Sequence, residues 1–230
     1  MSVEVVRKDI KNLHIAVYPP VGRVRVATPL RLDDDAVRVA VISRLGWIRR
    51  QQAQFADQVR QSERELATGE SIHFCGRRFR LDIIEPPGSP GVRVATNSRI
   101  QLRCRPGADH AQREATLNQW YREALRDQIP QLLRKWERQV GVEVAEVRIR
   151  RMKTRWGSCN AAARRIWLNL ELAKKPVSAL EYILVHEMIH IRERRHGERF
   201  REIMDVVMPS WQLHRDELNR APLSHEDWRY

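Results

Sequence analysis

Residues 186–190 read His186-Glu187-Met188-Ile189-His190, an HExxH pattern that composition alone would produce roughly 0.02 times in a chain of this size. On an α-helix, residues four apart project from one face about one turn apart, so both imidazoles can hold a single metal ion. Glu187 points aside by about 100° and can reach a water molecule on the open side of that ion. The pattern therefore predicts a zinc site, provided that it lies on a helix.

The flanking sequence favours a helix over residues 179–194. Ser178 and Glu181 have the spacing of a capping box, and Pro176 precedes them. Apolar residues recur at helical spacing and would pack this helix against a core: Leu180, Ile183, Leu184, Met188 and Ile191. Two further helices are expected over residues 197–207 and 210–220.

A catalytic zinc ion usually has three protein ligands and one exchangeable water, so a third ligand is needed. His196 extends the pattern to HExxHxxxxxH, a spacing that suits a helix ending after His190 and a chain that turns back beneath the metal. Metalloproteases with this spacing often place a glycine midway, where this chain has Glu193, although Gly197 can relax the backbone after the ligand. The alternative third ligand is a carboxylate from a later helix, and the candidates are Glu202 and Glu217.

Histidines beside an apolar face are more often packed or capping residues than ligands when they occur singly. Here three histidines accompany one inward glutamate. Burying that set without a metal would leave polar groups unpaired at a considerable free-energy cost. We therefore expect His186, His190 and His196 to bind Zn²⁺ and Glu187 to act on water.

The chain before residue 107 is expected to be rich in β-strands. Alternating segments predict strands over 3–7, 13–18 and 24–27, with a turn at 19–22, and a helix over 33–62 that begins at three aspartates. Two hairpins follow, which pair 72–74 with 79–84 and 92–95 with 100–104.

The remainder is expected to be mixed. A long amphipathic helix over 111–139 ends at Gly141 and is interrupted near Pro130, and two strands over 142–149 and 165–170 flank a basic loop. The predicted fold class is α+β, with a β-rich N-terminal domain over 1–106 and a small zincin-like metal-binding domain over 107–230.

Composition limits the protein's class. The 230 residues carry 42 Lys and Arg against 29 Asp and Glu, a formal net charge of +13, and 42% of them are hydrophobic, which is enough for a folded core. No window approaches eighteen uncharged apolar residues, so we expect neither a membrane span nor a secretory signal. The three cysteines are far apart and form no CxxC pair, which fits a reducing cytoplasm. The sequence does not indicate an oligomeric state.

Several blocks carry a resemblance to a known family: Arg151 to Cys159 (RMKTRWGSC), Trp167-Leu168-Asn169, Tyr182 to His190, His196 with Phe200, and Met208-Pro209-Ser210-Trp211. In order and spacing they resemble the YgjP-type (DUF45) zinc metallopeptidases, which are related to the SprT-like and WLM metallopeptidases. The resemblance implies a zinc peptidase that acts on a peptide or protein substrate, with His186, His190 and His196 as ligands and Glu187 as catalytic base. Arg195 departs from the family, whose members often have Asn or Asp there.

Three further residues are candidates for contact with the substrate or with the oxyanion: Arg155, Tyr182 and Asn169. Gly157 and Ser158 would allow a tight turn between the two strands, which is the structural interpretation of this block. The functional interpretation places Arg155 near the metal and lets strand 166–169 pair with an extended peptide.

The charge distribution supports a second hypothesis. Between residues 145 and 165 basic residues greatly outnumber acidic ones, and five arginines lie near His196: Arg192, Arg194, Arg195, Arg199 and Arg201. Such patches are typical of proteins with a polyanionic partner. The alternatives are a peptidase that acts on DNA-associated proteins and a nucleic-acid-binding module with a structural or vestigial metal site.

Overall fold

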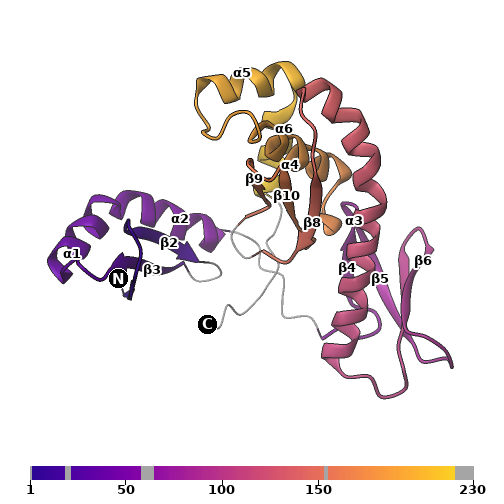
Figure 1. The fold of residues 1–230 in the computed structure, drawn as a ribbon. Helices are drawn as coiled ribbons and strands as arrows, with labels where there is room; N and C mark the ends of the chain where they lie inside the picture. The colour runs from indigo at the N-terminus through magenta and orange to yellow at the C-terminus, as the bar shows by residue number, and fades with distance from the viewer. Residues whose placement is uncertain (1, 19–21, 58–64, 153–154, 221–230) are drawn as a thin grey trace. The chain divides into compact units, whose positions relative to one another are not determined.

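The computed structural model describes residues 2–18, 22–57, 65–152 and 155–220 (Figure 1). Contacts within the chain divide it into two units, one formed before residue 64 and one by residues 65–220. Each unit is described by itself. None of the described helices is both long and apolar enough to cross a membrane.

The first unit is a three-stranded sheet with two helices, in the strand order β1-β3-β2. Its elements are β1 (Val3–Lys8), β2 (His14–Tyr18), β3 (Arg23–Pro29), α1 (Asp34–Ser43) and α2 (Leu45–Asp57). β3 is central, parallel to β1 and antiparallel to β2. Its buried valines pack with apolar residues of the helices to form a small core: Val24, Val26, Val37, Val41 and Ile48.

The three predicted strands of this unit are confirmed, and the predicted single helix is wrong. Asp33 caps α1 as expected, because its side chain accepts a hydrogen bond from the backbone N–H of Ala36 at 2.7 Å. Arg44 leaves the helical conformation and separates α1 from α2, and Gly46 further weakens helix formation there. The first three residues of the predicted turn at 19–22 and the predicted helix end at 58–62 lie outside the described residues.

The second unit begins with a four-stranded sheet in the order β4-β5-β7-β6. Its strands are β4 (Ser71–Phe74), β5 (Arg77–Ile84), β6 (Gly91–Thr96) and β7 (Arg99–Arg103), and both predicted hairpins are confirmed. Cys75 and Gly76 have φ angles of 47° and 76°, the left-handed pair that a two-residue hairpin turn requires. The parallel pairing of β5 with β7 joins the two hairpins into one sheet.

The long helix α3 (His110–Val140) is confirmed, with a capping box between Asp109 and Gln112 and a left-handed C-cap at Gly141. The interruption predicted near Pro130 is wrong, because α3 continues through that residue. Buried neighbours on either side, Leu125 and Trp136, hold the helix to the core despite the missing N–H of proline.

A second sheet of three strands has the order β8-β10-β9. Its strands are β8 (Glu146–Arg150), β9 (Gly157–Asn160) and β10 (Arg165–Asn169). The predicted turn at Gly157 and Ser158 is wrong, because these residues belong to β9, which is antiparallel to β10, whereas β8 and β10 are parallel. Parallel neighbours cannot be joined by a tight turn, so β9 occupies part of their connection. β10 is consequently the central strand.

The last described elements are a short 3₁₀-helix and three α-helices: η1 (Leu170–Lys174), α4 (Val177–Ile189), α5 (Glu198–Val207) and α6 (Trp211–Arg220). The predicted capping box of α4 is wrong, because the N-cap is Pro176 and makes no side-chain cap bond. Glu181 instead accepts hydrogen bonds from the indole Nε1 of Trp136 and from Lys135, at 2.7 and 2.5 Å.

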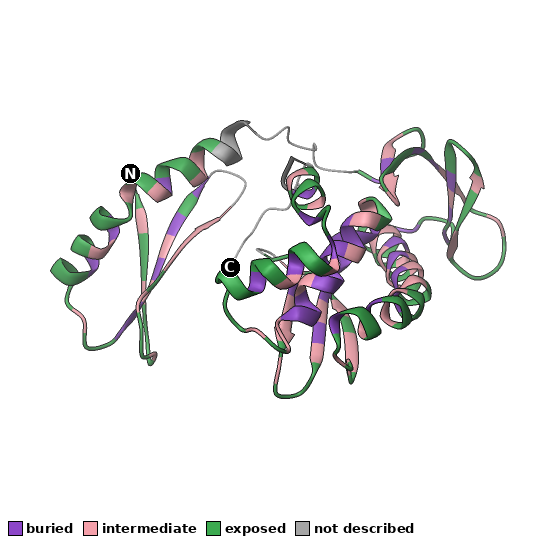
Figure 2. Cartoon of the chain, turned by 90° about the horizontal axis from the view of Figure 1, so that it is seen from above, coloured by how far each residue is buried: buried purple, intermediate pink, exposed green. Residues whose placement is uncertain are grey.

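One hydrophobic core holds the second unit together. Buried side chains of the four-stranded sheet, α3, β10 and α4 belong to a single packed cluster. Figure 2 marks the buried residues of the chain in purple. The four-stranded sheet therefore shares its core with the helices that follow. When the chain is divided by its internal contacts, the predicted domain boundary between residues 106 and 107 falls inside the second unit.

Candidate metal centre

Helix α4 fixes the direction of the HExxH side chains. It is buried on nearly all sides, with Leu184, Val185, Met188 and Ile189 fully enclosed. A helix that is apolar all round can be accommodated only inside a core, which leaves it one orientation. His186 lies in its last turn and His190 is its C-cap, so both predicted ligands come from the end of this helix.

The chain turns back after His190 without a glycine. Glu193 continues the turn by donating its backbone N–H to the carbonyl of Ile189 at 2.8 Å, and its side chain accepts the N–H of Arg195 at 3.1 Å. No residue between His190 and His196 has a positive φ angle. The Arg192 side chain donates to the carbonyl of Val140 at the end of α3 at 2.8 Å, which anchors this turn to the core.

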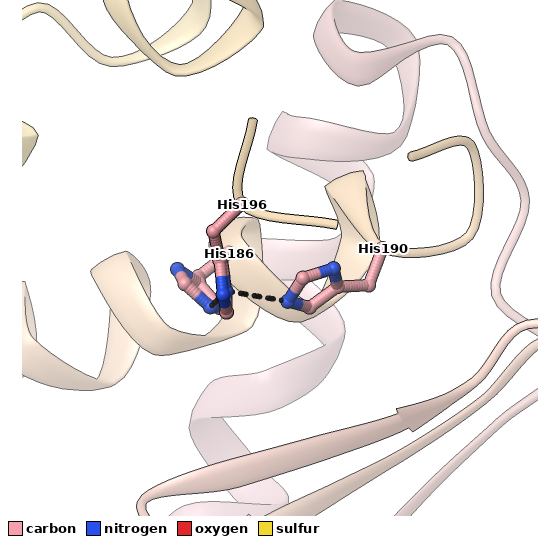
Figure 3. Close-up of side chains that lie close together, drawn as sticks. All are labelled: His186, His190 and His196. Atoms are coloured by element: carbon pink, nitrogen blue, oxygen red, sulfur yellow. Dashed lines mark hydrogen bonds between the residues drawn. The ribbon is translucent and has the colours of Figure 1, made fainter. Parts of the chain in front are cut away.

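The turn brings the three predicted ligands together (Figure 3). The Nε2 atom of His196 lies 2.9 Å from that of His190 and 2.9 Å from that of His186. Three nitrogens bound at about 2.0–2.1 Å to one tetrahedral ion would be about 3.3 Å apart, close to what is found. Glu202 and Glu217, the alternative third ligands, do not belong to this group.

The hydrogen bonds of the imidazoles also fit a cation. Nδ1 of His190 is 2.9 Å from the carbonyl oxygen of Glu193, so this ring nitrogen is the N–H and Nε2 presents its lone pair. His196 has one Nε2 proton at most, and it cannot be donated to both neighbours. Without a cation, at least one of the two short N···N contacts would have no hydrogen bond across it. Burial and the neighbouring imidazoles lower the pKa of His186 to about 3, so its ring is in the neutral form that ligation requires.

The ring of Phe200 packs against all three imidazoles of this cluster. This residue of α5 is 2% exposed, and its ring centroid lies 4.9 Å from the centroid of each of the three imidazoles. An apolar ring in contact with all three ligands restricts their rotation and excludes water from that side. The sequence offered only the spacing from His196 to Phe200 as a signal, and the contact with the ligands was not predicted.

Glu187 faces a cavity of about 900 Å³ that it shares with the three histidines and with β9. Burial raises the pKa of its carboxyl group to about 7, and the positive charge of Arg155 acts in the opposite direction. Gly157 of β9 lies directly against this side chain: a Cβ at position 157 would be 2.6 Å from Oε1 and 2.7 Å from Cγ of Glu187. Only glycine therefore permits β9 to approach the carboxylate this closely.

The other predicted site residues, Arg155, Tyr182 and Asn169, do not all lie at the cavity. Arg155 lines the cavity, whereas Tyr182 and Asn169 are not among its lining residues. Tyr182 is buried, with its ring edge-on to His186 at a centroid distance of 5.9 Å. Burial raises the pKa of its phenol.

The amide of Asn169 is occupied by the chain that carries Arg155. Its Nδ2 donates to the carbonyls of Met152 and Arg155 at 2.7 and 2.8 Å, and its Oδ1 accepts from the N–H groups of Met152 and Glu171. These bonds leave little capacity for substrate. The geometry makes Asn169 a support for the Arg155 segment.

A buried helix that presents HExxH, a third histidine on the following turn and a glutamate facing the same cavity together define a metallopeptidase. Comparison with family models agrees, because the model described as "YgjP-like, metallopeptidase domain" matches residues 11–221. The chain belongs to this YgjP-like family.

Among solved structures, the chain is similar to the metallopeptidase zymogen abylysin of Pyrococcus abyssi. The identity is 22%, the match covers 39% of this chain and 90% of that chain, and the TM-score is 0.37. Comparison with curated proteins finds no significant match.

Replacing His186, His190 or His196 with Ala should each lower metal content, because two imidazoles cannot supply the three nitrogens that converge in the structure. Metal analysis of the purified variants measures this directly. Glu202→Ala and Glu217→Ala are the matched controls and should retain the metal. If either control loses the metal while His196→Ala keeps it, His196 is not the third ligand.

Gly157→Ala should displace Glu187, because the new methyl group would overlap its carboxylate. We expect peptide hydrolysis to fall at least tenfold while the metal content is unchanged. Gly91→Ala is the control, since a Cβ there meets nothing within 4 Å. Full activity of Gly157→Ala would show that β9 does not restrain the glutamate.

Proposed function

We propose that this metallopeptidase is zinc-dependent and hydrolyses peptide bonds with Glu187 as general base. The observation that carries the proposal is the convergence of three imidazole nitrogens beside a buried carboxylate in one cavity. The all-nitrogen ligand set suits zinc. A zinc ion held by the histidines would polarise the substrate carbonyl and acidify water at the open position.

Glu187 would transfer a proton from the attacking water to the leaving amine. Its carboxylate accepts a proton from the attacking water as the carbon–oxygen bond forms, and returns it to the amine as the carbon–nitrogen bond breaks. Burial among the protein groups raises the pKa of Glu187 to about 7. The charge of a bound cation would lower this pKa and favour the carboxylate form that accepts a proton. Gly157 supports this role because the absence of a side chain at this position leaves room for the Glu187 carboxylate against β9.

The peptide substrate would lie along β9. The functional interpretation of the sequence paired an extended peptide with residues 166–169, but β10 is hydrogen-bonded on both sides, to β8 and to β9. In the described chain β9 pairs only with β10, and β9 lines the cavity, so its outer edge can accept an extended segment. Arg155 and Arg194 also line this cavity, which favours substrates with a carboxylate or a carbonyl oxygen placed toward them.

The basic surface near the site supports a second candidate, a peptidase that acts on nucleic-acid-associated proteins. Much of the basic excess of residues 145–165 is compensated, because Arg148, Arg151, Arg164 and Arg165 form ion pairs with glutamates. Lys153 lies outside the described residues. Arg155 and Arg194, which line the cavity, and Arg195, which is next to Arg194 in the chain, form no ion pair with any other described residue. The second candidate therefore rests on these three arginines. The three free cysteines fit the cytoplasm as its location.

Glu187→Gln should abolish most hydrolysis while leaving metal binding intact, because the amide keeps the shape of the side chain but accepts no proton. We expect the turnover rate on a denatured protein substrate to fall by at least a hundredfold, about the low end of a general base's contribution. Metal content serves as the internal control. Undiminished cleavage would refute the assignment of Glu187, and loss of metal would reassign it as a ligand.

If the arginines around the cavity contact nucleic acid, the logarithm of the affinity should fall with the logarithm of salt concentration. The expected slope is about −0.9 per phosphate contact on duplex DNA and about −0.7 on single strands. Anisotropy titrations of labelled DNA at several salt concentrations measure this, and Arg194→Glu with Arg195→Glu should weaken binding. Absence of binding at low salt would contradict this second candidate. The proposal of peptide hydrolysis would still stand.

A further inference from the structure

A second groove lies along the other edge of the three-stranded sheet, between α3 and β8. Its volume is about 630 Å³, and its floor is apolar, formed by Ile129, Pro130, Leu133, Val147 and Ile149, with Trp167 of β10 at the rim. It shares no lining residue with the cavity of the metal centre. The proposed peptidase mechanism therefore leaves this groove without a function.

One wall of the groove is an unpaired strand edge. In the described part of the chain, β8 pairs with β10 and with no other strand. On an edge strand, alternate backbone N–H and C=O groups point away from the sheet and form a template for an added strand. The other wall is helix α3, so the groove has the form in which an extended peptide lies between a strand and a helix.

The rim of the groove is basic. Arg126 of α3 and Arg148 of β8 line it, and Glu146 is the one acidic residue among its described lining residues. Glu146 is already neutralised, because both of its carboxylate oxygens accept hydrogen bonds, one from Nε of Arg148 and one from Nε of Arg165. Arg126 has no ion pair with any described residue. The uncompensated charge at this groove is positive.

Trp167 extends the basic rim. The guanidinium carbon of Arg150 lies 4.5 Å from the centroid of the indole, and that of Arg148 lies 5.3 Å from it. Both arginines are thus held at the rim of the groove by the ring. Arg150 forms no ion pair within the described residues, so its charge is available to a ligand.

We propose that this groove binds an extended acidic segment of a partner protein, which adds to β8 as a strand. Side chains of a strand alternate between its two faces, so one set of side chains would meet the apolar floor and the other would meet the arginines. The preferred segment alternates acidic with aliphatic residues. The strand edge favours a peptide over a nucleic acid, because only a peptide has main-chain groups that complete a ladder. The proposal requires no catalysis and is independent of the proposed function.

The test uses the full chain with Glu187→Gln, so that hydrolysis does not consume the probe. The probe is a short dye-labelled peptide in which Glu alternates with Val or Leu, and its binding is measured by fluorescence anisotropy. Arg126→Glu with Arg150→Glu should weaken binding at least tenfold. Arg78→Glu with Arg105→Glu makes the same change in net charge outside the groove and should leave the affinity within about twofold. Thermal unfolding of both double variants confirms that they are folded.

Two further measurements, on the protein without the arginine substitutions, separate strand addition from simple charge attraction. The same peptide with alternate backbone nitrogens methylated keeps its charges but loses main-chain donors, and should bind at least tenfold more weakly. Amide hydrogen exchange of residues 146–150 should slow when the unmethylated peptide binds.

Three outcomes would overturn the proposal: equal binding by both double variants, equal binding of the methylated peptide, or no binding of the acidic peptide. A thymidine oligonucleotide that binds more tightly than the peptide, and is lost with Arg126→Glu and Arg150→Glu, would assign the groove to nucleic acid instead.

Discussion

The contact between Gly157 and Glu187 is the interaction on which the arrangement of the site depends. It joins an edge strand to a buried helix without any intervening side chain, so the carboxylate, the metal ligands and the outer edge of β9 all border one cavity. A larger residue at 157 would require β9 to withdraw or Glu187 to rotate. Because α4 is enclosed by the core, it cannot shift to compensate. The packing of the second unit and the chemistry of the site are thus parts of one constraint.

After His190 the chain turns back toward His196 without the glycine that such a turn usually contains. A glycine is the usual means of turning toward a third ligand, yet this chain turns with negative φ angles throughout. The carbonyl of Glu193 fixes the tautomer of His190, and the side chain of Glu193 accepts a hydrogen bond from the N–H of Arg195. The side chain of Arg192 binds the turn to the end of α3. Phe200 then confines the three rings from behind. Main-chain and ring contacts replace the flexibility of glycine.

Local signals in the sequence predicted most of the elements and the three histidines that lie together. Periodicity identified the strands and helices, and the spacing from His186 to His196 identified the cluster that the structure brings together. Features that depend on distant partners were not predictable. The parallel pairing of β8 with β10 made β9 an edge strand, and Trp136 engaged Glu181 in place of the expected capping box. Asn169 was a candidate for substrate contact because its main-chain partners could not be known from spacing.

The two edges of the β8-β10-β9 sheet, which pair with no further strand among the described residues, carry different chemistry. The edge of β9 borders the carboxylate and the metal ligands, whereas the edge of β8 borders an apolar groove with a basic rim. Adjacent strands are about 4.8 Å apart, so two strand widths, about 10 Å, separate β8 from β9. One extended segment cannot occupy both edges, since β10 lies between them. A protein that docks at β8 must therefore present a second, separate segment to β9, which makes docking a means of selecting proteins by a feature remote from the bond that is cleaved.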